Sequence, residues 1–107
     1  MMIVTGSITA EAHCIDELFN LSLEHVRRSR AEPGCISHTV HREAENPLRI
    51  IFFEEWEDRA ALSAHFAVPD SRAFVRAARL LAVEPPSIEI YDASKVTDTF
   101  MAGRGPR

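Results

Sequence analysis

The sequence predicts a single α+β domain whose elements follow the order β-α-β-β-α-β. A chain of 107 residues that is 46% hydrophobic has the size and composition of one domain with one core. Four short segments are rich in β-branched and aromatic residues, and two longer regions repeat apolar residues at helical spacing. Turn-forming residues separate these segments at Glu32-Pro33-Gly34, Asn46-Pro47 and Pro85-Pro86.

The first strand and the first helix are predicted by a change of period. Met2 to Thr9 is short and β-branched, as expected for a strand. From Ala12 to Arg30, residues at helical spacing form one apolar stripe: Ile15, Leu18, Phe19, Ser22 and Val26. We expect His13 and His25 on this helix to be exposed. Glu32-Pro33-Gly34 ends the helix, since proline cannot continue it and glycine tolerates a tight turn.

The next two strands are predicted to be antiparallel neighbours. Cys35 to Arg42 and Arg49 to Trp56 flank a polar stretch with Asn46-Pro47, which is typical of a hairpin loop. Because side chains alternate along a strand, each strand presents one set of residues to each face. Ile36, His38 and Val40 are expected to share one face of the first of these strands. Phe52, Glu54 and Trp56 are expected to share one face of the second.

The last part of the chain is predicted to add a helical region and a fourth strand. Arg59 to Phe66 forms a helix that ends near Pro69, and Asp70 to Leu81 continues as a second helical segment. Ser87 to Tyr91 is the fourth strand. Residues 1–93 then form the domain, and residues 94–107 a C-terminal tail.

This order is the split βαβ arrangement of ferredoxin-like folds, in which helices cover one face of an antiparallel sheet. The second and third strands carry apolar residues on both faces, so the open face also needs a cover. The simplest cover is a second copy of the chain. We therefore expect a homodimer that packs sheet against sheet.

Charge and cysteine content exclude several classes of function. There are 12 basic and 16 acidic residues, and only Arg27, Arg28 and Arg30 gather, so no nucleic-acid partner is expected. No apolar run approaches the roughly 20 residues that span a bilayer. Without a secretory signal, the pattern predicts a cytoplasmic protein with no membrane partner. Cys14 and Cys35 are interpreted as reduced core residues.

Trp56 and His65 form the most informative pair of residues. Asp58 is a good N-cap, so a strand that ends at Trp56 would lead directly into the helix that carries His65. An indole offers a ligand a flat surface and one N–H donor, and an imidazole can change protonation near neutral pH. Alternatively, Trp56 is a core anchor and His65 lies at the edge of the apolar stripe. Glu54 either orients a neighbour or is a surface acid.

Other chemistries lack a sequence signature. No two histidines have i, i+4 spacing together with a third ligand, so no metal is predicted. No serine lies in a Gly-x-Ser-x-Gly context, and neither cysteine adjoins a histidine. The first strand is not followed by Gly-x-Gly-x-x-Gly, so no dinucleotide is expected.

One ordered series of residues resembles the antibiotic biosynthesis monooxygenase family, over about Met2 to Tyr91. The series consists of Glu32-Pro33-Gly34-Cys35, Asn46-Pro47, Phe53-Glu54-Glu55-Trp56, Ala61-Leu62 and His65. The resemblance implies a dimeric α/β barrel of ferredoxin-like subunits, with a cavity between sheet and helices in each. It also implies oxidation of quinols or anthrone-like aromatics by dioxygen without an added cofactor.

The family resemblance also assigns roles to single residues. His65 matches the helix histidine of the family, Trp56 its strand-end tryptophan and Glu54 its strand acid. His38 stands where tyrosine is frequent, and Asp70 where many relatives have a second histidine. A haem-degrading branch uses other residues, and at those places this chain has Ser7 or Gly6, His65 and Val75. Haem degradation is therefore not expected.

The resulting hypothesis is a cofactor-independent monooxygenase that oxidises a small aromatic or quinol-like molecule with dioxygen. His65 is expected to be the catalytic base, and Trp56 a wall and hydrogen-bond donor. The expected substrate-binding residues are His38, Glu54, Phe52 and Phe66. Two alternatives stay open: a dimeric metabolite-binding or stress-response module, and an isomerase or cyclase that uses the same pocket.

Overall fold

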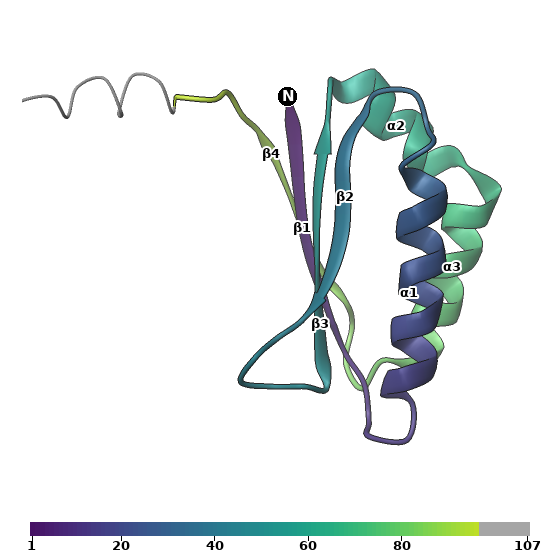
Figure 1. The fold of residues 1–107 in the computed structure, drawn as a ribbon. Coiled ribbons are helices and arrows are strands. Elements are labelled where there is room, and N and C mark those ends of the chain that lie inside the picture. Colours follow the sequence, from purple (N-terminus) through teal and green to yellow (C-terminus); the bar gives the residue numbers. More distant parts are fainter. Residues whose placement is uncertain (97–107) are drawn as a thin grey trace, which may run out of the picture.

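A computed structural model describes residues 1–96, so most of the predicted tail 94–107 lies outside the described residues. Four strands and three helices follow one another in the predicted order (Figure 1). They are β1 (Met2–Thr9), α1 (Ile15–Ser29), β2 (Cys35–Arg42), β3 (Arg49–Trp56), α2 (Arg59–Ala67), α3 (Pro69–Leu81) and β4 (Ser87–Asp92). The predicted α+β, ferredoxin-like fold is confirmed.

The sheet has the order β2-β3-β1-β4, and every pair of neighbours is antiparallel. Figure 1 shows all three helices on one side of this sheet, while its other side carries no helix from residues 1–96. Because β3 lies between β1 and β2, the helix-facing side chains of three strands converge beneath α1 and α2. That convergence positions the site.

Local chemistry sets the ends of α2 and α3. The Asp58 carboxylate accepts a hydrogen bond from the backbone N–H of Ala61 at 2.8 Å, which confirms the predicted N-cap. Val68 is extended, with ψ of 127°, because a residue that precedes proline is disfavoured in the helical region. Pro69 then begins α3, where its missing N–H costs no helical hydrogen bond.

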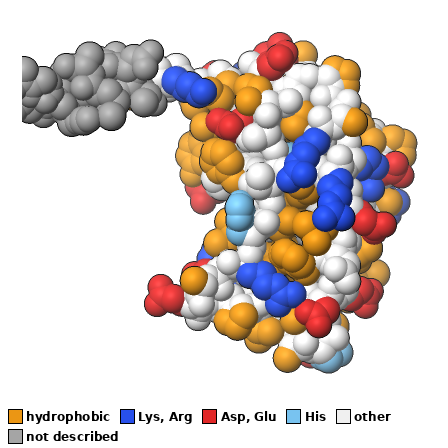
Figure 2. All heavy atoms as spheres, in the orientation of Figure 1, with side chains coloured by type: hydrophobic (Ala, Val, Ile, Leu, Met, Phe, Trp, Pro, Cys, Tyr) orange, Lys and Arg blue, Asp and Glu red, His pale blue; other side chains and the backbone are white. Residues whose placement is uncertain are grey.

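The core lies between the sheet and the helices and consists of two clusters of buried side chains. The larger cluster contains Ile8, Ala10, Ile15, Leu18, Val26, Ile50, Phe52 and Ala78. The smaller contains Met2, Val4, Trp56 and Leu62. Figure 2 shows hydrophobic side chains in the seam between the two layers, with Lys and Arg side chains beside them.

A β-bulge in β2 corrects one prediction about its faces. Cys35 pairs with Trp56 and Ser37 pairs with Glu55, so Ile36 is an extra residue in the ladder. Ile36 is 49% exposed, whereas Cys35 packs against the smaller core cluster. The expectation that Ile36 shares the buried face of His38 is therefore wrong. The predicted helix-facing residues of β3, Phe52, Glu54 and Trp56, are all buried.

The side of the sheet without helices carries apolar side chains. Phe53 on β3 is 37% exposed and Tyr91 on β4 is 46% exposed, while Ile3 and Ile51 are half-buried. Within residues 1–96, no helix has the length and apolar character that a membrane crossing requires.

Candidate functional site

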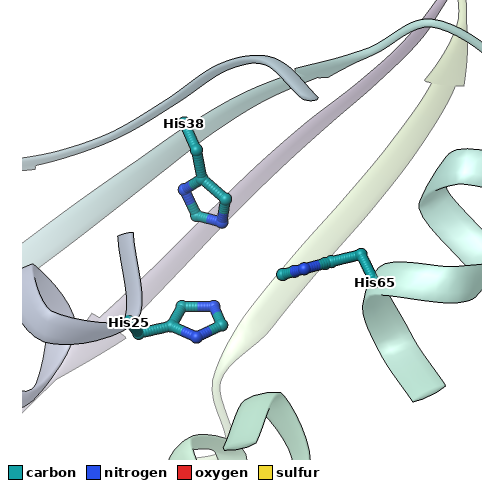
Figure 3. Close-up of side chains that lie close together, drawn as sticks. All are labelled: His25, His38 and His65. Carbon is teal, nitrogen blue, oxygen red and sulfur yellow. The ribbon is translucent and has the colours of Figure 1, made fainter. Parts of the chain in front are cut away.

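Three buried histidines from three different elements converge between the sheet and the helices. Their rings point toward one another from α1, β2 and α2 (Figure 3). His25, His38 and His65 are only 5%, 1% and 2% exposed. One ring nitrogen from each lies within 4.8 Å of the other two. The site is therefore a compact group of imidazoles around a common centre.

His25 corrects the expectation that it is exposed on the first helix. Leu18, Ser22, His25 and Ser29 lie at three- and four-residue spacing and are all buried. The His25 ring stacks on Phe74 of α3, with 4.3 Å between ring centroids and 6° between planes. The sequence did contain a signal for this burial, because the spacing between Leu18 and His25 places His25 on the apolar stripe of the helix.

His65 is held in place by Glu32, which the sequence analysis assigned only to a turn. The Nδ1 atom of His65 lies 2.9 Å from Oε1 of Glu32. The other ring nitrogen of His65, Nε2, is directed toward Glu54 and lies 3.8 Å from the Oε1 atom of that residue. Burial lowers the pKa of His65, and the hydrogen bond with Glu32 opposes that change.

Glu54 orients its neighbours and is not a surface acid. It is 7% exposed, and its Oε1 accepts a hydrogen bond from the indole N–H of Trp56 at 2.9 Å. Burial is the main reason that the pKa of Glu54 is raised to about 7. The hydrogen bond from Trp56 lowers this pKa, and the charge of Glu32 raises it further. Near neutral pH this carboxyl group can therefore accept or release a proton.

The ring of His38 is buried without a hydrogen bond. Its Nε2 lies 3.4 Å from Oε1 of Glu54, but within residues 1–96 neither of its ring nitrogens has a hydrogen-bond partner. Burial, with repulsion from His25 and then His65, lowers the pKa of His38 to about 3. Burial and the charges of His65 and Arg28 lower the pKa of His25 to about 3. Both rings are neutral at physiological pH.

A cavity of about 190 Å³ lies beside the histidines, between the sheet and α3. Its aromatic lining comes from Phe52, Phe66 and Phe74, and its polar lining includes His25, Glu54, His65 and Arg79. Phe66 is 39% exposed, so the cavity opens to solvent at this side of α2. An apolar pocket with a few convergent polar groups is the usual form of a small-molecule site.

The structure brings most of the predicted residues together and separates two of them from the cavity. His65, Glu54, Phe52 and Phe66 line the cavity. His38 contacts Glu54 behind the lining. Trp56 is 0% exposed and donates its N–H to Glu54, so it supports the site from the core instead of forming a cavity wall.

Comparisons with known proteins agree with the fold. The model of the family described as "Antibiotic biosynthesis monooxygenase" matches residues 1–77. An uncharacterized protein of Synechocystis, sll1783, is 35% identical over 98 residues, which is 92% of this chain. The match covers 65% of that relative, so this chain spans less than two thirds of its length.

Two solved structures share the fold over most of both chains. The crystal structure of an antibiotic biosynthesis monooxygenase is 27% identical, with a TM-score of 0.81, and the match covers 89% of this chain and 100% of that one. A candidate antibiotic biosynthesis monooxygenase from Deinococcus radiodurans is 26% identical, with a TM-score of 0.86. That match covers 90% of this chain and 95% of the other.

Proposed function

Because the chain belongs to the antibiotic biosynthesis monooxygenase family, we propose that it oxidises a small aromatic or quinol-like molecule with dioxygen and without an added cofactor. One observation carries this proposal. The oriented imidazole of His65 and the carboxyl group of Glu54 meet in a cavity that has three phenylalanine rings in its lining. This arrangement offers a base beside a surface that binds an aromatic ring.

The cavity volume favours a single-ring substrate. An apolar cavity of roughly 150 Å³ holds one benzene molecule. The volume here, about 190 Å³, leaves room for one ring with small oxygen substituents. We therefore expect hydroquinones to be better substrates than three-ring anthrones.

The chemistry begins with removal of a phenolic proton by His65. Glu32 holds Nδ1, so Nε2 carries the lone pair that accepts the proton. Electron transfer from the resulting anion to dioxygen then leads to oxygen insertion. For a hydroquinone, one oxygen atom enters the ring as the hydroxyl group of a hydroxyquinone and the other leaves as water. The substrate supplies all the electrons.

Arg79 is the charged residue that stabilises the substrate anion. It is the only Lys or Arg in the lining of this cavity within residues 1–96. A guanidinium group near a developing phenolate lowers the energy of the ionised substrate. Substitution of Arg79 should therefore weaken turnover of phenolic substrates.

Oxygen uptake by metal-stripped protein tests the proposal directly. Wild-type protein should consume dioxygen with a hydroquinone, and His65→Gln should lower that rate at least tenfold, because glutamine keeps a polar group near Glu32 but cannot act as a base. His13→Gln is the matched control, since His13 is exposed and lies outside the cavity. Equal rates for His65→Gln and wild type would remove His65 from the mechanism.

A metabolite-binding module is the second candidate function. The observation in its favour is that the Trp56 N–H is already donated to Glu54, so the indole cannot also stabilise a substrate anion. Mass analysis of a ligand that copurifies with the protein, before and after exposure to oxygen, separates the candidates. An unchanged ligand supports binding alone. Conversion without oxygen uptake supports an isomerase or cyclase.

The proposal includes a homodimer formed through the side of the sheet without helices. Phe53 and Tyr91 are exposed there, and Ile3 and Ile51 are half-buried. A second copy would remove this apolar surface from water. Light scattering should give about 24 kDa, twice the chain mass of 12.0 kDa, and a monomer at micromolar concentration would contradict the dimer.

A further inference from the structure

We propose that His25, His38 and His65 bind one divalent transition-metal ion. This inference goes beyond the proposed function, which uses His65 as a base in metal-free protein. It also departs from the sequence-based expectation of no metal, because the three histidines are far apart in the chain and only the fold brings them together.

The distances require only a small adjustment. Three nitrogens bound to a tetrahedral ion at about 2.0–2.1 Å lie roughly 3.3 Å apart. The ring nitrogens of the three histidines already lie within 4.8 Å of one another. Ring rotations that bring the farthest pair together by roughly 1.5 Å would therefore complete the geometry.

Glu32 prepares His65 for metal binding. A metal-ligating histidine usually donates its second ring N–H to a carboxylate, which fixes the tautomer and the ring orientation. The Nδ1 atom of His65 lies 2.9 Å from the Glu32 carboxylate, and both side chains are largely buried. This contact leaves Nε2 of His65 as the ligand atom.

His38 provides independent evidence that the site accepts a ligand. A buried polar side chain normally has a hydrogen-bond partner, and the absence of one requires an explanation. His38 is 1% exposed, and within the described residues neither of its ring nitrogens has a partner. A metal ion bound by the ring nitrogen that faces His25 and His65 would satisfy one of these two nitrogens.

Arg28 opposes metal binding through His25. Its guanidinium donates to Nδ1 of His25 across 3.3 Å, so Nε2 of His25 carries the proton in the metal-free protein. Ligation through Nε2 requires the other tautomer and the loss of this long hydrogen bond. Removal of the Arg28 guanidinium should therefore make metal binding tighter.

The ligand set identifies the class of ion. Three imidazoles suit zinc, cobalt, nickel, copper and ferrous ions, whereas calcium and magnesium prefer oxygen ligands. Glu54 lies 3.4 Å from His38 and 3.8 Å from His65, so its carboxylate could serve as a fourth ligand.

Metal binding and base catalysis use the same lone pair on Nε2 of His65. A bound ion would therefore exclude the proton transfer that the proposed function assigns to this nitrogen. For this reason the test of the metal site measures binding without substrate, and its outcome is separate from that of the oxidation assay.

Titration of the metal-free, full-length protein with Co²⁺ tests the site. The visible d–d absorption should saturate at one ion per chain, and Zn²⁺ should displace the signal. X-ray absorption of the Zn²⁺ protein should count three imidazole ligands at about 2.0–2.1 Å. A count of fewer than three imidazole ligands would overturn the inference, and so would the absence of Co²⁺ binding to the wild-type protein.

Variants assign the ligands. His25→Ala, His38→Ala and His65→Ala should each weaken Co²⁺ binding more than 100-fold, while the exposed histidines offer the matched controls His13→Ala and His41→Ala, which should not change it. Glu32→Gln should weaken binding about 10- to 100-fold. Arg28→Ala should strengthen it. Wild-type affinity in the three ligand variants, with circular dichroism showing folded protein, would place the ion elsewhere.

Discussion

The buried carboxyl group of Glu54 makes a contribution to stability that decreases as pH rises. Burial raises its pKa to about 7 in the folded protein, from its ordinary value of 4.5, which applies to the unfolded chain. Between these two values the folded protein binds more protons at this position than the unfolded chain does. The contribution of Glu54 to the free energy of unfolding therefore falls as pH rises through that range.

The size of the effect follows from the two pKa values. At about 1.36 kcal/mol per pKa unit, a pKa of about 7 instead of 4.5 corresponds to about 3 kcal/mol. Glu54→Gln removes this penalty and keeps a carbonyl oxygen that can accept the Trp56 N–H. Relative to wild type, the variant should gain about 2.5 kcal/mol of unfolding free energy between pH 5 and pH 8.

The neighbouring histidines act in the opposite direction, so the variant must be compared with wild type at each pH. Burial lowers the pKa values of His25 from α1 and His38 from β2 to about 3 in the folded protein, from the ordinary value of 6.5. Both rings stay neutral in the folded protein, so their contribution to stability is fully present above pH 6.5. This contribution is lost as pH falls below 6.5, because the unfolded chain then binds protons that the folded protein does not. His65 from α2 also has a lowered pKa, and Glu32 adds a nearby negative charge. The difference between the two proteins isolates Glu54.

Urea unfolding monitored by circular dichroism, in metal-free buffer and at fixed protein concentration, measures this difference. Glu55→Gln is the matched control, because the same chemical change is made at the adjacent residue, on the other face of β3. Parallel stability curves for wild type and Glu54→Gln from pH 5 to pH 8 would show that the Glu54 carboxyl group is not perturbed by burial.

Three further substitutions test the fold. Gly34→Ala should lower stability by about 2 kcal/mol or more, because φ is 82° and a Cβ would lie 2.5 Å from Cβ of Ala61; an unchanged urea midpoint would contradict this turn. Leu18→Ala should cost about 2–5 kcal/mol, since Leu18 is 0% exposed, whereas Leu80→Ala, at 87% exposed, should stay within about 0.5 kcal/mol. His38→Leu should raise the melting temperature, because it removes a buried polar ring without a partner; a lower value would reveal a stabilising contact of that ring.

The fold was predictable because its boundaries depend on local sequence. Alternating β-branched residues, Asp58 as N-cap and Pro69 as a helix break each act within a few positions, and the structure confirms all of them. The bulge at Ile36 could not be predicted in this way. It depends on how Cys35 pairs with Trp56, and a strand pattern alone does not specify the partner.

The candidate site was only partly predictable, because its residues meet through packing. Glu54 and His65 were identified since a strand and the following helix place them at one corner. His25 and Glu32 were missed because their importance depends on the position of α1 over the sheet. Trp56 was given the wrong role, since its hydrogen bond with Glu54 is visible only when both side chains are placed.

The polar cluster is better explained by function than by stability. Burying ionisable groups without full pairing costs free energy, and the larger core cluster shows that this fold buries ordinary apolar side chains elsewhere in the same layer. Three neutral imidazoles and a protonatable carboxyl group nevertheless occupy the space beside the cavity. Local rules of folding are broken most often at functional sites. Proton transfer and metal binding would both use what this arrangement provides: the lone pair of a buried, oriented imidazole beside a cavity. A substrate and a metal ion would compete for Nε2 of His65, so their relative affinities and concentrations would decide which of them occupies it.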